Sequence, residues 1–267
     1  LGAREPGVVL DFGSGVGAFD GYNTATSWGG LSSNGALHFG LDGADLLDGG
    51  SGIDRMHGGH GNDVYVVDNS LDLAVELAGG GHDIVRSAVS YVLGAHVEDL
   101  ELTGTAPVDA TGNAMQNSLR GNAAANRLDG AGGNDMLVGG AGNDTYIMAR
   151  GHGVDTVYEN DATAGNADIA AFIGDIGAEQ LWFRRAGTSL DVGIIGTADL
   201  LRVSGWYSGD AYRIETFRSG DGRTLLDSQV QNLVDAMAGF APPAMGQTHL
   251  PEMLASQLAP VIAANWH

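Results

Sequence analysis

A nine-residue repeat constrains the fold of this chain more than any other feature of its sequence. The segment GGSGIDRMH at 49–57 is followed directly by GGHGNDVYV at 58–66. Both carry glycine at positions one, two and four, aspartate at position six and a large hydrophobic side chain at position eight. One unit earlier, Gly40, Gly43, Asp45 and Leu47 stand at positions one, four, six and eight. Tandem units of this kind predict a solenoid, in which each coil contacts only its neighbours.

The same frame returns in a second block. Its units begin at Gly112, Gly121, Gly130 and Gly139. Position six is held by Asn117, Asn126, Asp135 and Asp144, and position eight by Leu119, Leu128, Leu137 and Tyr146. A glycine-rich flexible linker is the alternative for such a composition. That alternative fails because a linker has no reason to keep a large side chain at position eight.

The aspartate after each glycine cluster points to cation binding. Glycine lowers the stability of regular structure, so dense runs are kept where a positive φ or a close backbone approach is needed. Turns of this kind expose carbonyl oxygens, and calcium binds six to eight carbonyl and carboxylate oxygens at about 2.3–2.6 Å. Stacked aspartates without a cation would repel one another. The pattern therefore predicts that bound cations stabilise the fold.

These units resemble the RTX family, whose nonapeptide G-G-x-G-x-D-x-U-x builds a calcium-binding parallel β-roll. The match is best at GGSGIDRMH, GGHGNDVYV, GAGGNDMLV and GGAGNDTYI. The resemblance implies an all-β fold, a parallel β-roll (β-solenoid), with calcium as the cofactor. Two nonapeptides form one coil in this family, so loops 18 residues apart stack. Stacking then pairs Asp45 with Asp63, Asp54 with Asp72, Asn117 with Asp135, and Asn126 with Asp144.

The two blocks are expected to differ in calcium affinity. Each second-block pair carries one carboxylate where the best sites of the family carry two, so we expect weaker or partly vacant sites there. The residues assigned to metal binding lie in the turns of both blocks. They are Gly40, Asp42, Gly43, Asp45, Gly49, Ser51, Gly52, Asp54, Gly58, Gly59, His60, Gly61, Asp63, Asp72, Asn117, Asn126, Gly130, Gly132, Gly133, Asp135, Gly139, Gly140, Ala141, Gly142 and Asp144.

The chain divides into five segments by pattern. Residues 1–39 are an N-terminal segment or the remnant of an upstream domain, and 40–66 are the first repeat block. Residues 67–111 alternate apolar and polar positions and predict metal-poor solenoid strands, and 112–180 hold the second block with flanking strands. Residues 181–267 predict a small C-terminal β-plus-helix cap and, by the resemblance, a secretion-signal region.

The cap is expected to contain two turns and helical segments. Hairpin turns are predicted at Gly187 and at 221–222. Apolar residues spaced from Leu226 to Met237 predict a helix that stops at Gly239. A second apolar pattern runs from 250 to 262 but meets Pro260.

Composition excludes several classes of partner. The formal net charge is -21, from 33 acidic and 12 basic residues, which disfavours nucleic acid and anionic membrane surfaces. No run approaches the roughly 18 apolar residues of a membrane span. The absence of cysteine excludes disulfides and thiolate metal sites. Because the chain opens on Leu1, we expect it to be a piece of a longer protein.

Other motifs in the sequence are incomplete. VVLDFGSGVGAFD at 8–20 resembles the opening of an S-adenosylmethionine methyltransferase, but the remaining βα units do not fit before the repeats begin. The same stretch resembles a degenerate L-D-x-D-G-D-G calcium segment, with glycine where acids are wanted. His57 and His60 lack a third zinc ligand. Ser14 lacks the full G-x-S-x-G elbow, and no nucleophile, base and orienter set is evident.

The leading hypothesis is a calcium-dependent folding and secretion module. The resemblance implies the C-terminal part of a protein exported by type I secretion machinery from a Gram-negative bacterium, located outside the cell or on its surface. The upstream cargo domain is unknown. The alternatives are the tail of a secreted enzyme, such as a lipase, protease or epimerase, and the stalk of an adhesin.

Overall fold

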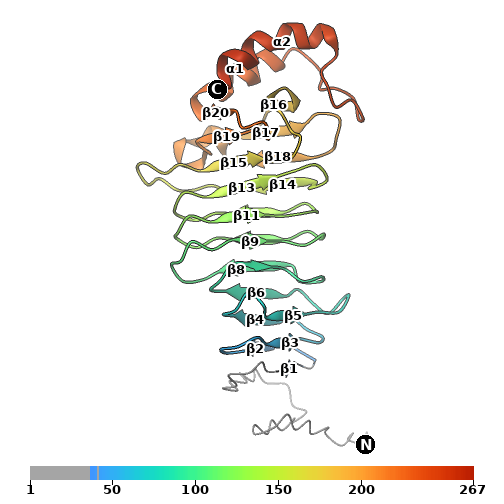
Figure 1. The fold of residues 1–267 in the computed structure, drawn as a ribbon, viewed down its shortest axis with the longest axis vertical. Helices are drawn as coiled ribbons and strands as arrows, with labels where there is room; N and C mark the ends of the chain where they lie inside the picture. The colour runs from blue at the N-terminus through green and yellow to red at the C-terminus, as the bar shows by residue number, and fades with distance from the viewer. Residues whose placement is uncertain (1–36, 41) are drawn as a thin grey trace, which may run out of the picture.

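Stacked coils of short parallel strands form the body of the molecule in the computed structural model, which describes residues 37–40 and 42–267. Figure 1 shows the coils rising from β1 towards two helices at the C-terminal end. This is the expected parallel β-solenoid, mostly β, with a helical cap. The motif at 8–20, Ser14 and most of the segment 1–39 lie outside the described residues.

The strands belong to three sheets. Their orders are β1-β3-β5, then β16-β17-β18-β14-β12-β10-β8-β6-β4-β2, and β20-β19-β15-β13-β11-β9-β7. The strands are β1 (Leu37–Phe39), β2 (Leu46–Asp48), β3 (Arg55–His57), β4 (Val64–Val67), β5 (Leu73–Val75), β6 (Ile84–Ser87), β7 (Tyr91–Val92), β8 (Asp99–Leu102), β9 (Ala110–Thr111), β10 (Ser118–Arg120), β11 (Arg127–Asp129), β12 (Met136–Val138), β13 (Thr145–Met148), β14 (Val154–Val157), β15 (Ile169–Phe172), β16 (Leu181–Ala186), β17 (Ser189–Ile194), β18 (Leu200–Val203), β19 (Thr216–Arg218) and β20 (Thr224–Leu226).

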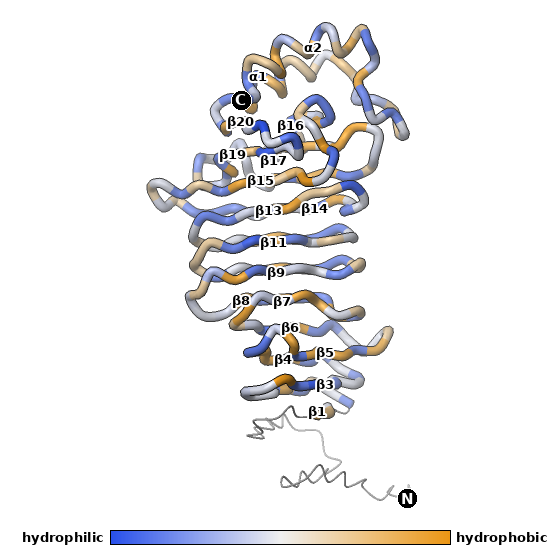
Figure 2. The backbone as a smooth tube through the Cα atoms, viewed as in Figure 1, coloured by the Kyte–Doolittle hydropathy of each residue, from blue (hydrophilic) through white to orange (hydrophobic). Residues whose placement is uncertain are grey.

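Position eight of each repeat supplies the core, as the sequence predicts. The position-eight side chains of both blocks are buried: Leu47, Met56, Tyr65, Leu119, Leu128, Leu137 and Tyr146. Figure 2 shows apolar and hydrophilic stretches alternating along the coils. A strand of three residues can point only its middle side chain inward when both ends face outward. Repetition of that one side chain therefore builds a continuous core column.

Equivalent repeats stack in parallel at a spacing of two units. Leu47 is paired with Tyr65, and Leu128 is paired with Tyr146. One coil of the solenoid therefore contains two nonapeptides, as the resemblance implied. The solenoid also continues through 67–111, because β4, β6, β8 and β10 pair in parallel order.

The backbone conformation at position four requires glycine. Gly43, Gly52, Gly61, Gly133 and Gly142 have φ between 113° and 142°, a region that side chains with a Cβ rarely adopt. An alanine or larger residue at these positions would strain the turn.

The cap continues the solenoid sheets and then turns into helices. The hairpins predicted at Gly187 and Gly222 join β16 to β17 and β19 to β20, and both glycines have positive φ. Short helical turns η1 (Ala178–Gln180), η2 (Trp206–Ser208) and η3 (Asp210–Tyr212) precede α1 (Asp227–Met237) and α2 (Glu252–Asn265). Among the described residues, none of the helices is long and apolar enough to cross a bilayer.

The helices differ from expectation in two details. Leu226 ends β20 and is 49% exposed, so the buried face of α1 begins at Val230. Helix α2 runs through Pro260. The carbonyl that loses its partner belongs to Ser256, four residues earlier, and this residue is exposed to water, which can satisfy it.

Candidate metal sites

The position-six residues of the first block form a ladder of hydrogen bonds. Asp63 Oδ1 accepts a 2.8 Å bond from the backbone N–H of Asp45, and Asp72 Oδ1 accepts a 2.9 Å bond from that of Asp54. Asp83 Oδ1 in turn accepts a 2.8 Å bond from the N–H of Asp63. One carboxylate oxygen thus holds the coil below. The second oxygens of Asp63 and Asp83 are left for another ligand, whereas Asp72 Oδ2 accepts hydrogen bonds from the N–H groups of Asp68 and Asn69.

The second block repeats the ladder with amides on its lower rungs. Asp135 Oδ1 accepts a 2.7 Å bond from the N–H of Asn117, and Asp144 Oδ1 accepts a 2.8 Å bond from that of Asn126. The structure therefore brings together all four pairs expected from the spacing of 18. Whether the pairs bind calcium stays a prediction.

The asparagines occupy their turns differently from aspartate. The side-chain amide of Asn117 donates to the carbonyls of Val97 and Glu98, and that of Asn126 donates to the carbonyl of Val108. An amide N–H therefore takes carbonyl oxygens that a cation could otherwise use. This contact gives the expectation of weaker sites in these turns a physical cause.

The position-one glycines leave space for converging oxygens. A Cβ on Gly58 would overlap Asp63 Oδ2, Glu76 Oε1 and the hydroxyl of Tyr65. A Cβ on Gly139 would overlap Asp144 Oδ2 and the hydroxyl of Tyr146. The remaining predicted turn residues at position three, Asp42, Ser51, His60 and Ala141, have exposed side chains.

Buried carboxylates gather in two groups that the sequence analysis did not assign in full. One contains Asp63, Glu76 and Asp83, and the other contains Asp144, Glu159 and Asp168. In each group the three residues are buried and offer oxygens within 4.8 Å of one another. The sequence does hold a signal for Asp83: it directly precedes the apolar strand β6, as Asp63 directly precedes β4, and the two strands are paired in parallel.

Burial makes ionisation of these acids costly in the absence of a cation. It raises the pKa of Asp63 to about 6, that of Asp144 to about 7 and that of Glu159 to about 8. It also raises the pKa values of the stacked pair Asp135 and Asp155. A cation placed among these oxygens would stabilise the ionised forms.

Among the described residues, the buried carboxylate oxygens without a hydrogen-bond partner include Asp63 Oδ2, Asp83 Oδ2, Asp135 Oδ2, Asp144 Oδ2 and Asp155 Oδ2. Native proteins pair nearly all buried polar atoms, so each such atom calls for an explanation such as an ion. The donor set consists of carboxylates and turn carbonyls, which are the hard oxygen ligands that calcium prefers. The residues present therefore fit calcium.

His57 and His60, the two histidines at zinc-compatible spacing, lie in different surroundings. The ring of His57 stacks on Phe39 with centroids 5.1 Å apart, and the His60 side chain is exposed. Among the described residues, the two groups able to hold a metal contain carboxylates and no histidine.

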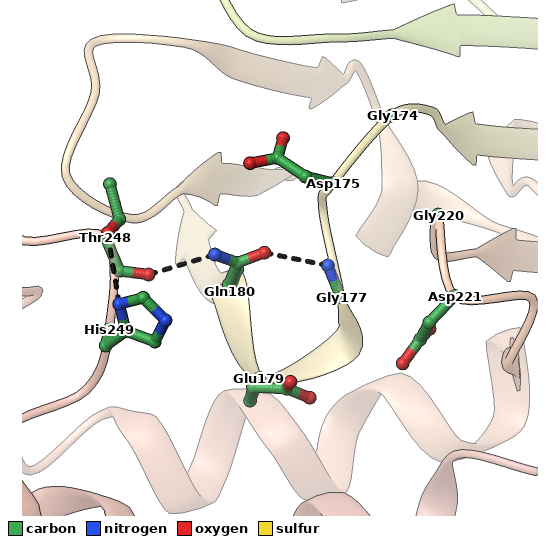
Figure 3. Close-up of a pocket in the computed structure, with 9 residues that line it drawn as sticks. All are labelled: Gly174, Asp175, Gly177, Glu179, Gln180, Gly220, Asp221, Thr248 and His249. Atoms are coloured by element: carbon green, nitrogen blue, oxygen red, sulfur yellow. Dashed lines mark hydrogen bonds between the residues drawn. The ribbon is translucent and has the colours of Figure 1, made fainter.

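A pocket lies where the solenoid meets the cap. Figure 3 shows the residues that line it, which are Gly174, Asp175, Gly177, Glu179, Gln180, Gly220, Asp221, Thr248 and His249. Gln180 accepts a 2.9 Å bond from the N–H of Gly177 and donates a 3.0 Å bond to the carbonyl of Thr248. These bonds join the last solenoid turn to the segment that enters α2.

Comparison with known proteins finds the same repeats. The family model of the RTX calcium-binding nonapeptide repeat matches in four copies, at residues 39–69 and 111–146. The chain is 37% identical over 98 residues to the endo-1,3-1,4-beta-glycanase ExsH of Rhizobium meliloti, covering 36% of this chain and 21% of ExsH. It is 34% identical over 92 residues to the iron-regulated protein FrpA of Neisseria meningitidis, covering 33% of this chain and 8% of FrpA.

These matches span a small part of each relative, less than a quarter of its length. A solved structure, the extracellular lipase LipA of Serratia marcescens, shares 18% identity and a TM-score of 0.25, over 65% of this chain and 37% of LipA. At that TM-score the likeness supports no conclusion about this chain.

Proposed function

The chain carries RTX calcium-binding nonapeptide repeats in a β-roll, and on this premise we propose that it is a module that folds when it meets extracellular calcium after type I secretion. The observation that carries the proposal is the set of buried, unpartnered oxygens of Asp63, Asp83 and Asp144. An uncompensated buried charge opposes folding, and a divalent cation removes that cost.

The residues that would hold calcium are the position-six aspartates and the glycine-rich turns beside them. Bound calcium supplies two positive charges between neighbouring loops, and binding to the folded state stabilises that state by mass action. Extracellular calcium modules bind at about 10⁻⁴–10⁻³ M, which suits folding outside the cell and not inside it. With a net charge of -21, the calcium-free chain also repels itself.

The experiment compares the chain in chelator with the chain in calcium. We expect weak strand circular dichroism without calcium and strong strand signal with millimolar calcium. Matched magnesium is the control, because magnesium demands a tighter octahedral geometry and gives up its water reluctantly. An identical spectrum in chelator and in calcium would overturn the proposal.

A second candidate is that this module serves as the tail of a secreted enzyme. The match to 21% of the length of a glycanase supports this, because similar repeats there belong to a longer protein whose name specifies an enzyme. Sequencing the gene upstream of this segment tests this candidate. A catalytic domain encoded there would support the role of an enzyme tail, and a further run of repeats would favour an adhesin stalk.

A further inference from the structure

Each repeat block ends with a glutamate in the place of a position-one glycine. In the first block, β3 and β5 pair His57 with Val75, so the next residue, Glu76, stacks on Gly58. In the second block, β12 and β14 pair Leu137 with Val157, which places Glu159 over Gly139 two residues later. The nonapeptide frame places Glu76 at position one, 18 residues after Gly58, but it does not place Glu159, which lies 20 residues after Gly139.

Each glutamate contacts a tyrosine of the neighbouring coil that precedes it in the chain. The hydroxyl of Tyr65 donates a hydrogen bond to Glu76 Oε1, and the hydroxyl of Tyr146 donates one to Glu159 Oε1. Each tyrosine takes position eight in the last glycine-rich unit of its block. The bare glycine at 58 leaves room for the carboxylate of Glu76. The bare glycine at 139 leaves room for the Asp144 carboxylate and for the Tyr146 hydroxyl that Glu159 contacts.

A third carboxylate completes each group from the following coil. The N–H of Asp63 donates to Asp83 across 20 residues, and that of Asp144 donates to Asp168 across 24 residues. The same arrangement thus arises twice from coils of different length. Within each group, the three carboxylate oxygens lie within 4.8 Å of one another.

In the described part of the chain, no arginine pairs directly with these groups. Among the described residues, the ion pairs of arginine involve other acids, and none of the six carboxylates takes part. Asp63 Oδ2 in one group and Asp144 Oδ2 in the other are fully buried and unpartnered, and Asp63 Oδ2 lies beside Glu76 Oε1 at Gly58. Three clustered carboxylates without a counter-charge are a site for a cation.

We propose that Glu76 and Glu159 are calcium ligands that close the two repeat blocks, each completing a three-carboxylate site with the last two stacked aspartates. This inference rests on the proposed function and extends it to residues outside the nonapeptide. A glutamate in place of glycine supplies a charged oxygen at the coil where the glycine-rich turns end. The ligand set has more negative charge than the asparagine-containing turns, so these two sites are the tighter ones.

The test counts calcium ions and measures affinity by calorimetry on the full chain. The variants are Glu76→Gln, Glu159→Gln and the double variant. Glutamine keeps the volume and still accepts the tyrosine hydrogen bond, but it removes the charged ligand. Each single variant is expected to lower the affinity for one calcium ion by at least about tenfold. The double variant should lower the affinity for two ions. Glu101→Gln is the matched control, because this outward-facing residue of β8 loses the same charge away from both groups.

Two further variants separate ligation from a merely structural hydrogen bond. Tyr146→Phe removes the donor and leaves the carboxylate, so calcium binding should persist. Glu159→Gly restores the usual position-one residue and should lose affinity as Glu159→Gln does. Circular dichroism at saturating calcium verifies that each variant folds.

The outcomes distinguish this inference from the proposed function. If the wild-type chain takes up calcium and the double variant binds the same number of ions with unchanged affinity, the glutamates are not ligands and the inference is wrong. If the wild-type chain takes up no calcium, the proposed function itself is wrong.

Discussion

Asn117 and Asp135 are stacked position-six residues joined by a 2.7 Å hydrogen bond from the backbone of the first to the carboxylate of the second. The Asn117 side chain meanwhile donates to two carbonyls of the coil below it. An asparagine rung is therefore satisfied by the chain itself. An aspartate rung such as Asp63 keeps a buried oxygen without a partner.

This contrast predicts which position-six substitution has the larger effect on calcium-induced folding. Asp63→Ala should raise the calcium concentration at the folding midpoint, because it removes a carboxylate beside Glu76 and Asp83. Asn117→Ala removes no carboxylate, so it should raise that midpoint less, and only through its cost to the folded state. That cost should be about 1–3 kcal/mol in saturating calcium, because the N–H of Asn113 loses its acceptor and the two carbonyls each lose one of their two donors. Calcium titrations followed by circular dichroism, run side by side, measure both. Equal midpoints in the two variants would count against the assignment.

Two glycines of one turn should differ sharply in tolerance to alanine. A Cβ on Gly130 would overlap the carboxylate of Asp135, whereas the nearest atom to a Cβ on Gly132 is 3.6 Å away. Gly130→Ala should therefore displace Asp135 and raise the calcium midpoint severalfold. Gly132→Ala, which serves as its control, should behave as wild type. If both variants shift the midpoint alike, contact with the carboxylate is not what selects glycine at position one.

The repeat determines much of this architecture, since the inward column at position eight and the stacking of units 18 residues apart follow from its frame. The closing groups follow from the frame only in part. Glu76 keeps the 18-residue spacing from Gly58, whereas Glu159 lies over Gly139 only because its coil is two residues longer. That register is a property of strand pairing, which the nonapeptide pattern does not specify once the glycines end. The passage of α2 through Pro260 likewise depends on the exposure of Ser256.

Stability without calcium should fall as the pH rises. Burial raises the pKa of Asp144 to about 7 and that of Glu159 to about 8, whereas carboxyls of an unfolded chain titrate at about 4. The folded calcium-free chain therefore binds protons more tightly than the unfolded chain. This contribution to stability is complete below pH of about 4 and is lost as the pH rises through about 7 to 8.

The measurement is strand circular dichroism of calcium-depleted protein between pH 8 and pH 5, which stays above the sequence pI of 4.3. We expect more structure at pH 5 than at pH 8. In calcium titrations the direction reverses, because protons compete with the cation, and the calcium midpoint should rise as the pH falls. Glu159→Gln should show a smaller pH effect without calcium. Greater calcium-free structure at pH 8 than at pH 5 would contradict the raised pKa values.

The C-terminal cap should act as the template on which the second block folds. Its strands β18 and β19 pair in parallel with β14 and β15, the last strands of the solenoid. The cap also has an aromatic core that needs no metal. Phe217 lies 5.7 Å, between ring centroids, from both Phe183 and Trp206.

Deletion of 181–267 should therefore weaken calcium-induced folding of 112–147 more than that of 40–66, because each coil of a solenoid contacts only its neighbours. The substitution Phe217→Ala in the full chain is a milder perturbation of the cap than the deletion. It removes a fully buried ring and should cost about 3–5 kcal/mol in the cap. Hydrogen exchange at saturating calcium measures protection in each block separately. Exposed Phe240 in the segment after α1 gives a control substitution, Phe240→Ala, that should leave both blocks protected. If the truncated chain protects the two blocks as well as the full chain does, the cap is not the template.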